Sequence, residues 1–238
     1  MKNILPLVTS SHKRALFTLL GVFVMSSAMG DNPPYFLEGF ESGTLPAGWS
    51  REYVKGTNDW RFYNGGYSPN DPNYILPANA NDPTRNPSAA HGGTYDAMFQ
   101  LQSVNDEATK LVTPSINLGT AVKPQLNFWL AQVPWTFGGS TSWDALRVYY
   151  KTSASGSWNL LATYDFPIST WTEYSINLPN PTSTYFIGFE GTTQWGLGTC
   201  IDDISVVEKG NQNRWVKSVT SIDGPLDFVP SGSSNNPI

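Results

Sequence analysis

The residues most suited to chemistry are two adjacent carboxylates, Asp202 and Asp203, within "TCIDDISVVE" (199–208). The β-branched neighbours predict a strand, although Asp is depleted in strands. Successive strand side chains point to opposite faces, so strict alternation places one aspartate on the face that carries the core. Because an unpaired buried carboxylate is very costly, we expect it to bind a metal ion, backbone N–H groups, or an arginine such as Arg61 or Arg147.

The sequence gives little support for catalysis. Cys200 is the only cysteine, and His91 is the only histidine after the N-terminal thirty residues. One histidine and one cysteine cannot build the usual zinc site, and neither a G-x-S-x-G nor an H-E-x-x-H pattern occurs. We therefore expect Cys200 to be a buried structural thiol and His91 to be an ordinary loop histidine.

Aromatic side chains are the other candidate binding groups. The chain contains nine Trp, and several aromatics fall in or beside loops: Trp135, Trp143, Trp195, Tyr67 and Tyr74. Exposed Trp and Tyr beside Asn and Asp are typical of a surface that stacks against sugars. They are equally typical of a protein interface, where such residues concentrate binding energy. These five residues are therefore the predicted ligand contacts.

The N-terminal residues 1–30 have the pattern of a secretory signal. Lys2, Lys13 and Arg14 precede an apolar run, "ALFTLLGVFVM", that is too short for a comfortable membrane span. Ala28 and Gly30 then supply the small residues of a cleavage site. We predict a signal peptide over 1–30, with an uncleaved anchor as the alternative, and no membrane insertion after cleavage.

The remaining chain is acidic. Without the three basic residues of the signal, 11 of the 14 Lys and Arg remain against 19 Asp and Glu, a net charge of −8. This charge argues against nucleic acid and anionic membrane surfaces as partners. We therefore expect a protein that is secreted or displayed on the outer-membrane surface.

The elements that must position these residues are short strands separated by Gly, Pro, Asn, Asp and Ser clusters. This pattern predicts an all-β antiparallel sandwich or barrel. One loop, at 64–93, is unusually long, and loops of this length are functional, ion-holding or disordered. A second loop, at 133–143, joins two strands and contains three aromatic residues. The strands are expected at 35–40, 60–63, 96–101, 109–112, 125–132, 144–152, 158–165, 171–178, 185–190 and 199–207.

The pattern changes after Glu208. Residues 209–214 have the composition of a linker, and 215–238 begin an apolar strand and a Pro/Gly turn. We predict one domain over 31–208, a linker over 209–214, and the truncated start of another β domain over 215–238, which resembles an Ig-like repeat.

Seven segments in order resemble the cleaved-adhesin domains of gingipain-type Bacteroidetes proteins. They are "FESGTLPAGW", "GTNDW", "TKLVTPSINL", "LNFWLA", "DALRVYYKTS", "TWTEYSINLP" and the closing "YFIGFEGTTQWGLGTCIDDISV". These modules overlap in fold with MAM and choice-of-anchor J domains. The resemblance covers about 36–208 and implies a jelly-roll β-sandwich.

The resemblance also implies a structural Ca²⁺ site. Family members hold the ion through the Glu of the opening motif and an Asp of the closing one, here Glu41 and Asp202, with Asp203 beside them. Asn58 and Asp59 are further candidates, because Ca²⁺ takes six to eight oxygen ligands. The resemblance places Trp49, Trp60, Trp129 and Trp171 in the core.

Taken together, these features predict a non-catalytic adhesion module that recognises host or matrix protein or glycan. The alternative is a carbohydrate-binding module that accompanies a glycosidase or peptidase domain further along a longer protein. A third hypothesis, a jelly-roll glycosidase, stays open because 19 acidic residues allow many carboxylate pairs.

Overall fold

The computed structural model describes residues 33–66, 86–100 and 106–209. Within these ranges the regular structure is entirely β-strand, and no helix there is capable of crossing a membrane. The predicted signal peptide, most of the linker and the Ig-like start lie outside the described residues, as do Tyr67 and Tyr74.

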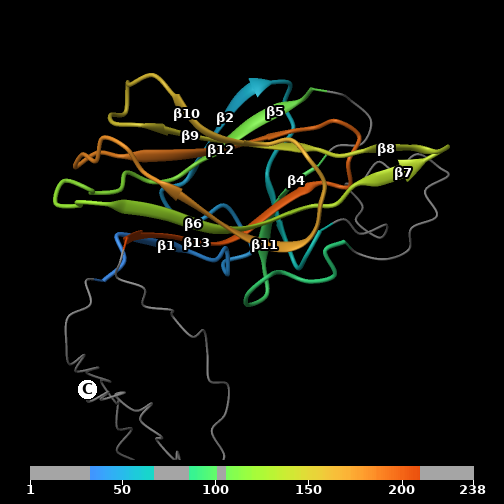
Figure 1. Cartoon of the computed structure of the whole chain (residues 1–238), viewed down its shortest axis with the longest axis horizontal. Helices are drawn as coiled ribbons and strands as arrows, with labels where there is room; N and C mark the ends of the chain where they lie inside the picture. Colours follow the sequence, from blue (N-terminus) through green and yellow to red (C-terminus); the bar gives the residue numbers. More distant parts are fainter. Residues whose placement is uncertain (1–32, 67–85, 101–105, 210–238) are drawn as a thin grey trace, which may run out of the picture. The chain divides into compact units, whose positions relative to one another are not determined.

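Two antiparallel sheets form the layers of the sandwich (Figure 1). Sheet A has six strands, in the order β11 (Ile168–Asn177), β6 (Pro124–Gln132), β13 (Thr199–Glu208), β4 (Asp96–Phe99) and β3 (Arg61–Tyr63). The sixth strand, β1 (Phe36–Glu38), pairs with the second half of β13, whereas β4 pairs with its first half. The first and last strands of the domain are therefore neighbours.

Sheet B has five strands, in the order β10 (Asn159–Tyr164), β9 (Ala145–Lys151), β12 (Phe186–Thr192), β5 (Ala108–Val112) and β2 (Ser50–Lys55). A separate hairpin, β7 (Trp135–Phe137) with β8 (Ser140–Ser142), joins β6 to β9. It extends from one end of the sandwich (Figure 1).

The core lies between the two sheets. Sheet A contributes Phe128 and Leu130, and sheet B contributes Leu111 and Phe189, all with no exposed surface. Trp60 is equally buried beside them and donates its indole N–H to the Thr109 carbonyl at 2.8 Å. Each large apolar side chain buried in this way contributes about 1.5–3 kcal/mol to stability.

The strands predicted from sequence are all present, with ends that shift by a few residues. Three strands were not predicted. β2 was missed because the charged "SREYVK" has no apolar alternation, and its strand state depends on pairing with β5. β7 and β8 were assigned to a loop, although Gly138 and Gly139 between them adopt positive φ and close a hairpin.

Candidate functional site

Strand β13 does not alternate strictly, because a β-bulge that includes Asp203 falls between Asp202 and Ser205. Asp202 lies opposite Trp129 on β6, whereas Ser205 lies opposite Asn127, so β13 has one extra residue between these pairs. Asp203 has a φ of 46°, in the left-handed region. A bulge of this kind bends the strand and redirects its side chains.

The bulge decides which side chains of β13 reach the core. Ile201, Ile204 and Val206 all belong to the core between the sheets. Cys200 packs in a separate cluster outside it, and the backbone places Asp202 on the same side as Cys200. The prediction that strict alternation brings an aspartate onto the core face is therefore wrong. The prediction of a buried thiol at Cys200 is confirmed.

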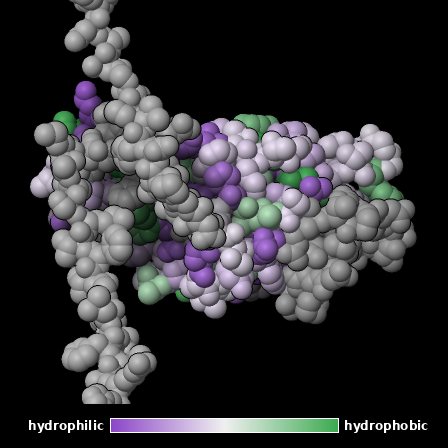
Figure 2. All heavy atoms as spheres, turned by 90° about the horizontal axis from the view of Figure 1, so that it is seen from below, coloured by the Kyte–Doolittle hydropathy of each residue, from purple (hydrophilic) through white to green (hydrophobic). Residues whose placement is uncertain are grey.

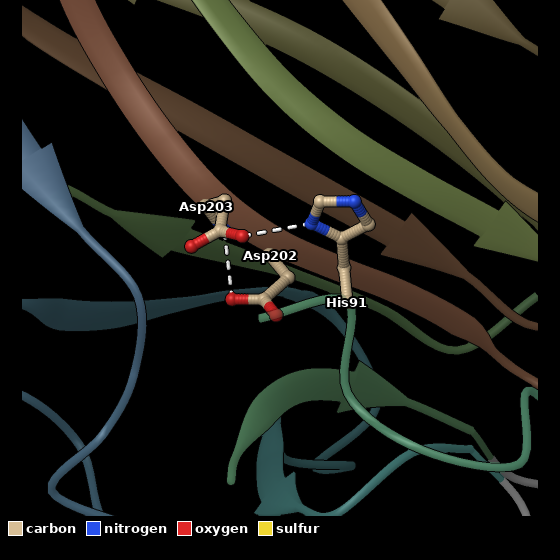
Figure 3. Close-up of side chains that lie close together, drawn as sticks. All are labelled: His91, Asp202 and Asp203. Carbon is tan, nitrogen blue, oxygen red and sulfur yellow. Dashed lines mark hydrogen bonds and ion pairs between the residues drawn. The ribbon is translucent and has the colours of Figure 1, made fainter. Parts of the chain in front are cut away.

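The two aspartates form a compact cluster with His91 (Figure 3). The His91 Nδ1 atom lies 2.7 Å from Asp203 Oδ2. Asp202 Oδ2 accepts the Gly92 N–H at 2.9 Å, and Asp202 Oδ1 accepts the Asp203 N–H at 2.7 Å. One possible ligand atom from each of the three side chains lies within 4.8 Å of the others. Backbone N–H groups, rather than Arg61 or Arg147, are therefore the partners of Asp202.

His91 is packed between two tryptophans. Its ring stacks on Trp129 with a centroid distance of 3.6 Å and an interplanar angle of 13°, and Trp171 meets it edge-on at 6.0 Å. The Trp171 indole N–H donates to the Ala89 carbonyl at 3.0 Å. These contacts correct two predictions. His91 is not an ordinary loop histidine, and the two tryptophans are only partly buried, outside the main core, whereas Trp49 and Trp60 are core residues.

Glu41 reaches the same short segment from the turn after β1. Its Oε2 atom accepts the Thr94 N–H at 2.9 Å. Gly93 lies beneath this carboxylate with a φ of 64°, and a Cβ atom there would overlap Glu41. The segment 91–94 therefore contacts two carboxylates that are far apart in sequence, Asp202 through the Gly92 N–H and Glu41 through the Thr94 N–H. Glu41 is not within the tighter cluster of three side chains.

Asn58 and Asp59 lie in different surroundings. The buried Asn58 side chain donates to the Gln100 carbonyl at 3.2 Å. Asp59 Oδ1 accepts the Tyr53 hydroxyl at 2.5 Å and lies 3.5 Å from Arg51 Nε. Neither residue belongs to the cluster around Asp202, so the structure does not bring these two candidates together with it.

The electrostatics of the cluster fit a cation. The pKa of Asp202 is raised to about 7, chiefly by burial and also by the charges of Asp203 and Asp96, while the N–H groups of Gly92 and Asp203 oppose the shift. Asp202 and Asp203 supply hard oxygen donors of the kind that Ca²⁺ prefers, beside one nitrogen donor from His91, and Glu41 adds a third carboxylate that accepts the Thr94 N–H. The buried Cys200 thiol, whose pKa burial raises well above its ordinary value, is not in the cluster. The donor set therefore suits Ca²⁺ better than zinc.

A second candidate site is a row of aromatic rings at the β7–β8 hairpin. The Trp135 ring lies 5.4 Å from Phe137 at an angle of 11°, and 6.4 Å from Trp195 at 22°. Phe137 is 54% exposed, and both tryptophans are partly exposed. We call these three side chains the aromatic row. Trp143 is not in it, because its indole N–H donates instead to Asp165 Oδ1 at 3.0 Å.

A buried carboxylate holds one end of the aromatic row. Asp144 accepts backbone N–H groups from Gln194 at 2.6 Å, Gly196 at 3.0 Å and Gly198 at 2.9 Å. Burial raises its pKa to about 6 against the lowering effect of these bonds. Trp195 lies in the same turn with a φ of 69°, a strained conformation that the surrounding bonds maintain.

Sequence reasoning missed Asp144 as a member of this site. An aspartate next to Trp143 at the start of an apolar strand was the available signal. Phe137 was grouped from sequence with Trp135, Trp143 and Trp195 as a loop aromatic, but it was not named as a ligand contact.

Comparisons with known proteins bear on the fold. No protein-family model matches the sequence, and no curated protein matches it. The K3 cleaved adhesin domain of Lys-gingipain from Porphyromonas gingivalis W83 is similar, with 18% identity over 74% of this chain and 99% of that chain and a TM-score of 0.51. The K1 domain has 19% identity over 74% and 98%, with a TM-score of 0.50. At these identities the likeness shows the fold.

The chain is thus a jelly-roll β-sandwich, as predicted. The resemblance to gingipain-type adhesin domains is confirmed at the level of the fold, whereas membership of the choice-of-anchor J group stays a prediction. A carbohydrate-binding module in complex with beta-1,4-galactotriose is also similar, with 16% identity over 75% of this chain and 100% of that chain and a TM-score of 0.48.

Proposed function

We propose that the chain is an exported, non-catalytic adhesion module that binds a glycan or a protein outside the cell. The observation that carries this proposal is the aromatic row of Trp195, Trp135 and Phe137 on a projecting hairpin. Parallel, partly exposed rings offer flat apolar surfaces and contain no group that performs acid–base chemistry. The signal pattern of residues 1–30 supports export to the medium or the cell surface.

A glycan fits the aromatic row better than a protein does. The neighbouring strand β8 carries hydroxyl groups rather than apolar side chains, and Thr141 Oγ1 lies 3.0 Å from Thr136 Oγ1. Protein hot spots are instead surrounded by contacts that exclude water. A turn ordered in advance by Asp144 also lowers the entropic cost of binding. The second candidate, a carbohydrate-binding module beside a catalytic domain of a longer protein, would use the same rings.

We further propose a structural calcium ion held by Glu41, Asp202 and Asp203. The ion would neutralise carboxylates that lie against the segment 91–94, and so tie that segment to β13 and to the turn after β1. Metal affinity would then be part of the folding free energy, because the ligands come from separate segments.

Glycan binding is tested with the purified chain against an array of glycans and extracellular-matrix proteins. Phe137→Ala and Trp135→Ala are expected to weaken binding by about tenfold or more, as for other aromatic anchors. Trp143→Ala is the matched control, because its indole lies outside the aromatic row, and it should bind like the parent. Failure to bind any glycan or protein, or equal losses in the control, would contradict the proposal.

A further inference from the structure

Sheet B carries a row of charged side chains on the face that points away from the core. Glu52 lies opposite Lys110, Lys110 lies opposite Glu190, and Glu190 lies opposite Arg147. The alternate residues of these strands belong to the core, among them Leu111, Leu146, Val148 and Phe189. The charged row therefore crosses four adjacent strands on the outer face, which is the upper side of the sandwich in Figure 1.

The centre of the charged row is withdrawn from water. Lys110 Nζ lies 2.6 Å from Glu190 Oε2, and only 8% and 7% of the two side chains are exposed. Glu190 Oε1 accepts the Tyr149 hydroxyl at 3.4 Å and lies 3.6 Å from Arg147 Nη1. Burying such a pair costs several kcal/mol per ion, and a hydrophobic pair is often as stable. Stability alone therefore does not account for this network.

An aromatic ring is fixed beside the charged row. A Cβ atom on Gly188 would lie 3.1 Å from the Trp158 ring, so the indole uses the space that this glycine leaves on β12. The Trp158 Nε1–H donates to both carboxylate oxygens of Glu52, at 3.1 and 3.0 Å. Lys151 Nζ lies 4.6 Å from the ring centroid. The ring is thus oriented by contacts on several strands and remains partly exposed.

We propose that the outer face of sheet B is a second ligand-binding surface, and that it takes a stretch of a carbohydrate chain. The exposed members of the charged row offer a donor at Arg147 and an acceptor at Glu52, while Lys110 and Glu190 between them are nearly buried and pair with each other. A ligand with charge of one sign would meet a like charge at half of these positions. Sugar hydroxyl groups both donate and accept, so they satisfy both kinds of residue.

Two rings supply the apolar part of this surface. The partly exposed Trp158 lies at one side of the charged row, and Tyr149 lies within it, with Lys110 Nζ 4.8 Å from its ring centroid. Polar groups that already hold one another in place lose little freedom on binding. The inference rests on the proposed extracellular binding function and names its ligand class, but it uses none of the hairpin residues.

Affinity electrophoresis of the purified full chain in gels containing soluble xylan, galactan, glucomannan or mixed-linkage glucan tests the inference. Arg147→Ala and Trp158→Ala are expected to weaken binding to the retained polysaccharide at least tenfold. Arg147 is 31% exposed, and its removal leaves the Lys110–Glu190 pair intact. Lys55→Ala is the matched control, since Lys55 is an ion-paired cation on β2 of the same sheet, and it should bind normally.

Tyr149→Phe tests whether a loss of binding reflects unfolding. It removes only the hydroxyl, so it should keep the melting temperature of the parent and weaken polysaccharide binding severalfold. Binding lost in Phe137→Ala but kept in Arg147→Ala and Trp158→Ala would overturn this inference and leave the proposed function standing. If the chain binds none of the four polysaccharides, the inference also falls, and only recognition of a protein or another glycan would remain of the proposed function.

Discussion

Asp144 beside the aromatic row can be compared with Asp202, which lies in the cluster with Asp203 and His91. Both carboxylates are buried. Asp144 accepts three backbone N–H groups from one turn, and Asp202 accepts two, from Gly92 and from Asp203. Burial raises the pKa of both, to about 6 for Asp144 and about 7 for Asp202. Each carboxylate thus orders a loop that carries candidate binding residues.

The surroundings of the two carboxylates differ. The pKa of Asp144 is set by burial and its three N–H donors alone. The pKa of Asp202 is also raised by the neighbouring charge of Asp203, and Glu41 approaches the same segment. A carboxylate whose bonds are saturated by backbone donors is a structural group. Three carboxylates gather around the segment 91–94, which is the arrangement on which the proposed calcium site rests, and this difference separates the two sites.

The largest expected effect is at Asp144. Asp144→Ala leaves three buried N–H groups without an acceptor, at about 1–3 kcal/mol each, and we expect a loss of about 4 kcal/mol in the free energy of unfolding. Asp144→Asn keeps one acceptor oxygen and should lose about half as much. Urea denaturation measures both, with Asp165→Ala as the control, because Asp165 is an exposed aspartate just after β10 that accepts the Trp143 indole N–H. Stability equal to the parent in Asp144→Ala would show that the turn is held by other contacts.

The effect of Ca²⁺ on stability should distinguish Asp202 from Asp144. Thermal unfolding in EDTA and in millimolar Ca²⁺ should differ by about 2.7 kcal/mol if the ion is present at a hundred times its Kd. Asp202→Asn and Glu41→Gln should abolish this difference, whereas Asp144→Asn should keep it.

Asp59→Asn is the matched control for the calcium experiment, because Asp59 is engaged by Arg51 and Tyr53. It should respond to Ca²⁺ like the parent. The calcium site would be refuted by a parent chain that does not respond, or by a response that survives in both Asp202→Asn and Glu41→Gln.

The smallest expected change in stability separates two glycines. Gly138 at the hairpin tip and Gly93 in the segment 91–94 have similar φ values of 58° and 64°. A Cβ atom on Gly138 meets nothing within 4 Å, so Gly138→Ala should cost only the backbone strain, about 1 kcal/mol. Gly93→Ala adds an overlap with Glu41 and should cost about 2 kcal/mol.

Chemical denaturation gives the free energy of unfolding of Gly138→Ala and Gly93→Ala, each alone and combined with Glu41→Ala. The extra cost of Gly93→Ala should disappear in the Glu41→Ala background, because the overlapping carboxylate is gone. Equal costs at the two glycines in the parent would show that Glu41 does not rest on the segment 91–94.

The sequence by itself determined the strands and the fold class. Apolar alternation and turn residues are local signals, and they predicted β6 (Pro124–Gln132), β9 (Ala145–Lys151) and β13 (Thr199–Glu208) within a few residues. They failed at β2 (Ser50–Lys55), where charged residues become a strand only through pairing with β5. The resemblance to adhesin domains named Glu41 and Asp202 as candidate ligands, and the aromatic type of Trp135 beside a loop named it as a candidate contact.

Only the tertiary structure decided which of these candidates meet. His91 reaches Asp203 across 112 positions of sequence, and no local pattern carries that information. The bulge at Asp203 exists because β13 has one more residue than β6 between two of their paired positions. The sequence of β13 alone therefore does not reveal it. The role of Asp144 likewise follows from a turn fifty residues away. Strand formation depends on neighbours in sequence, whereas sites depend on neighbours in space.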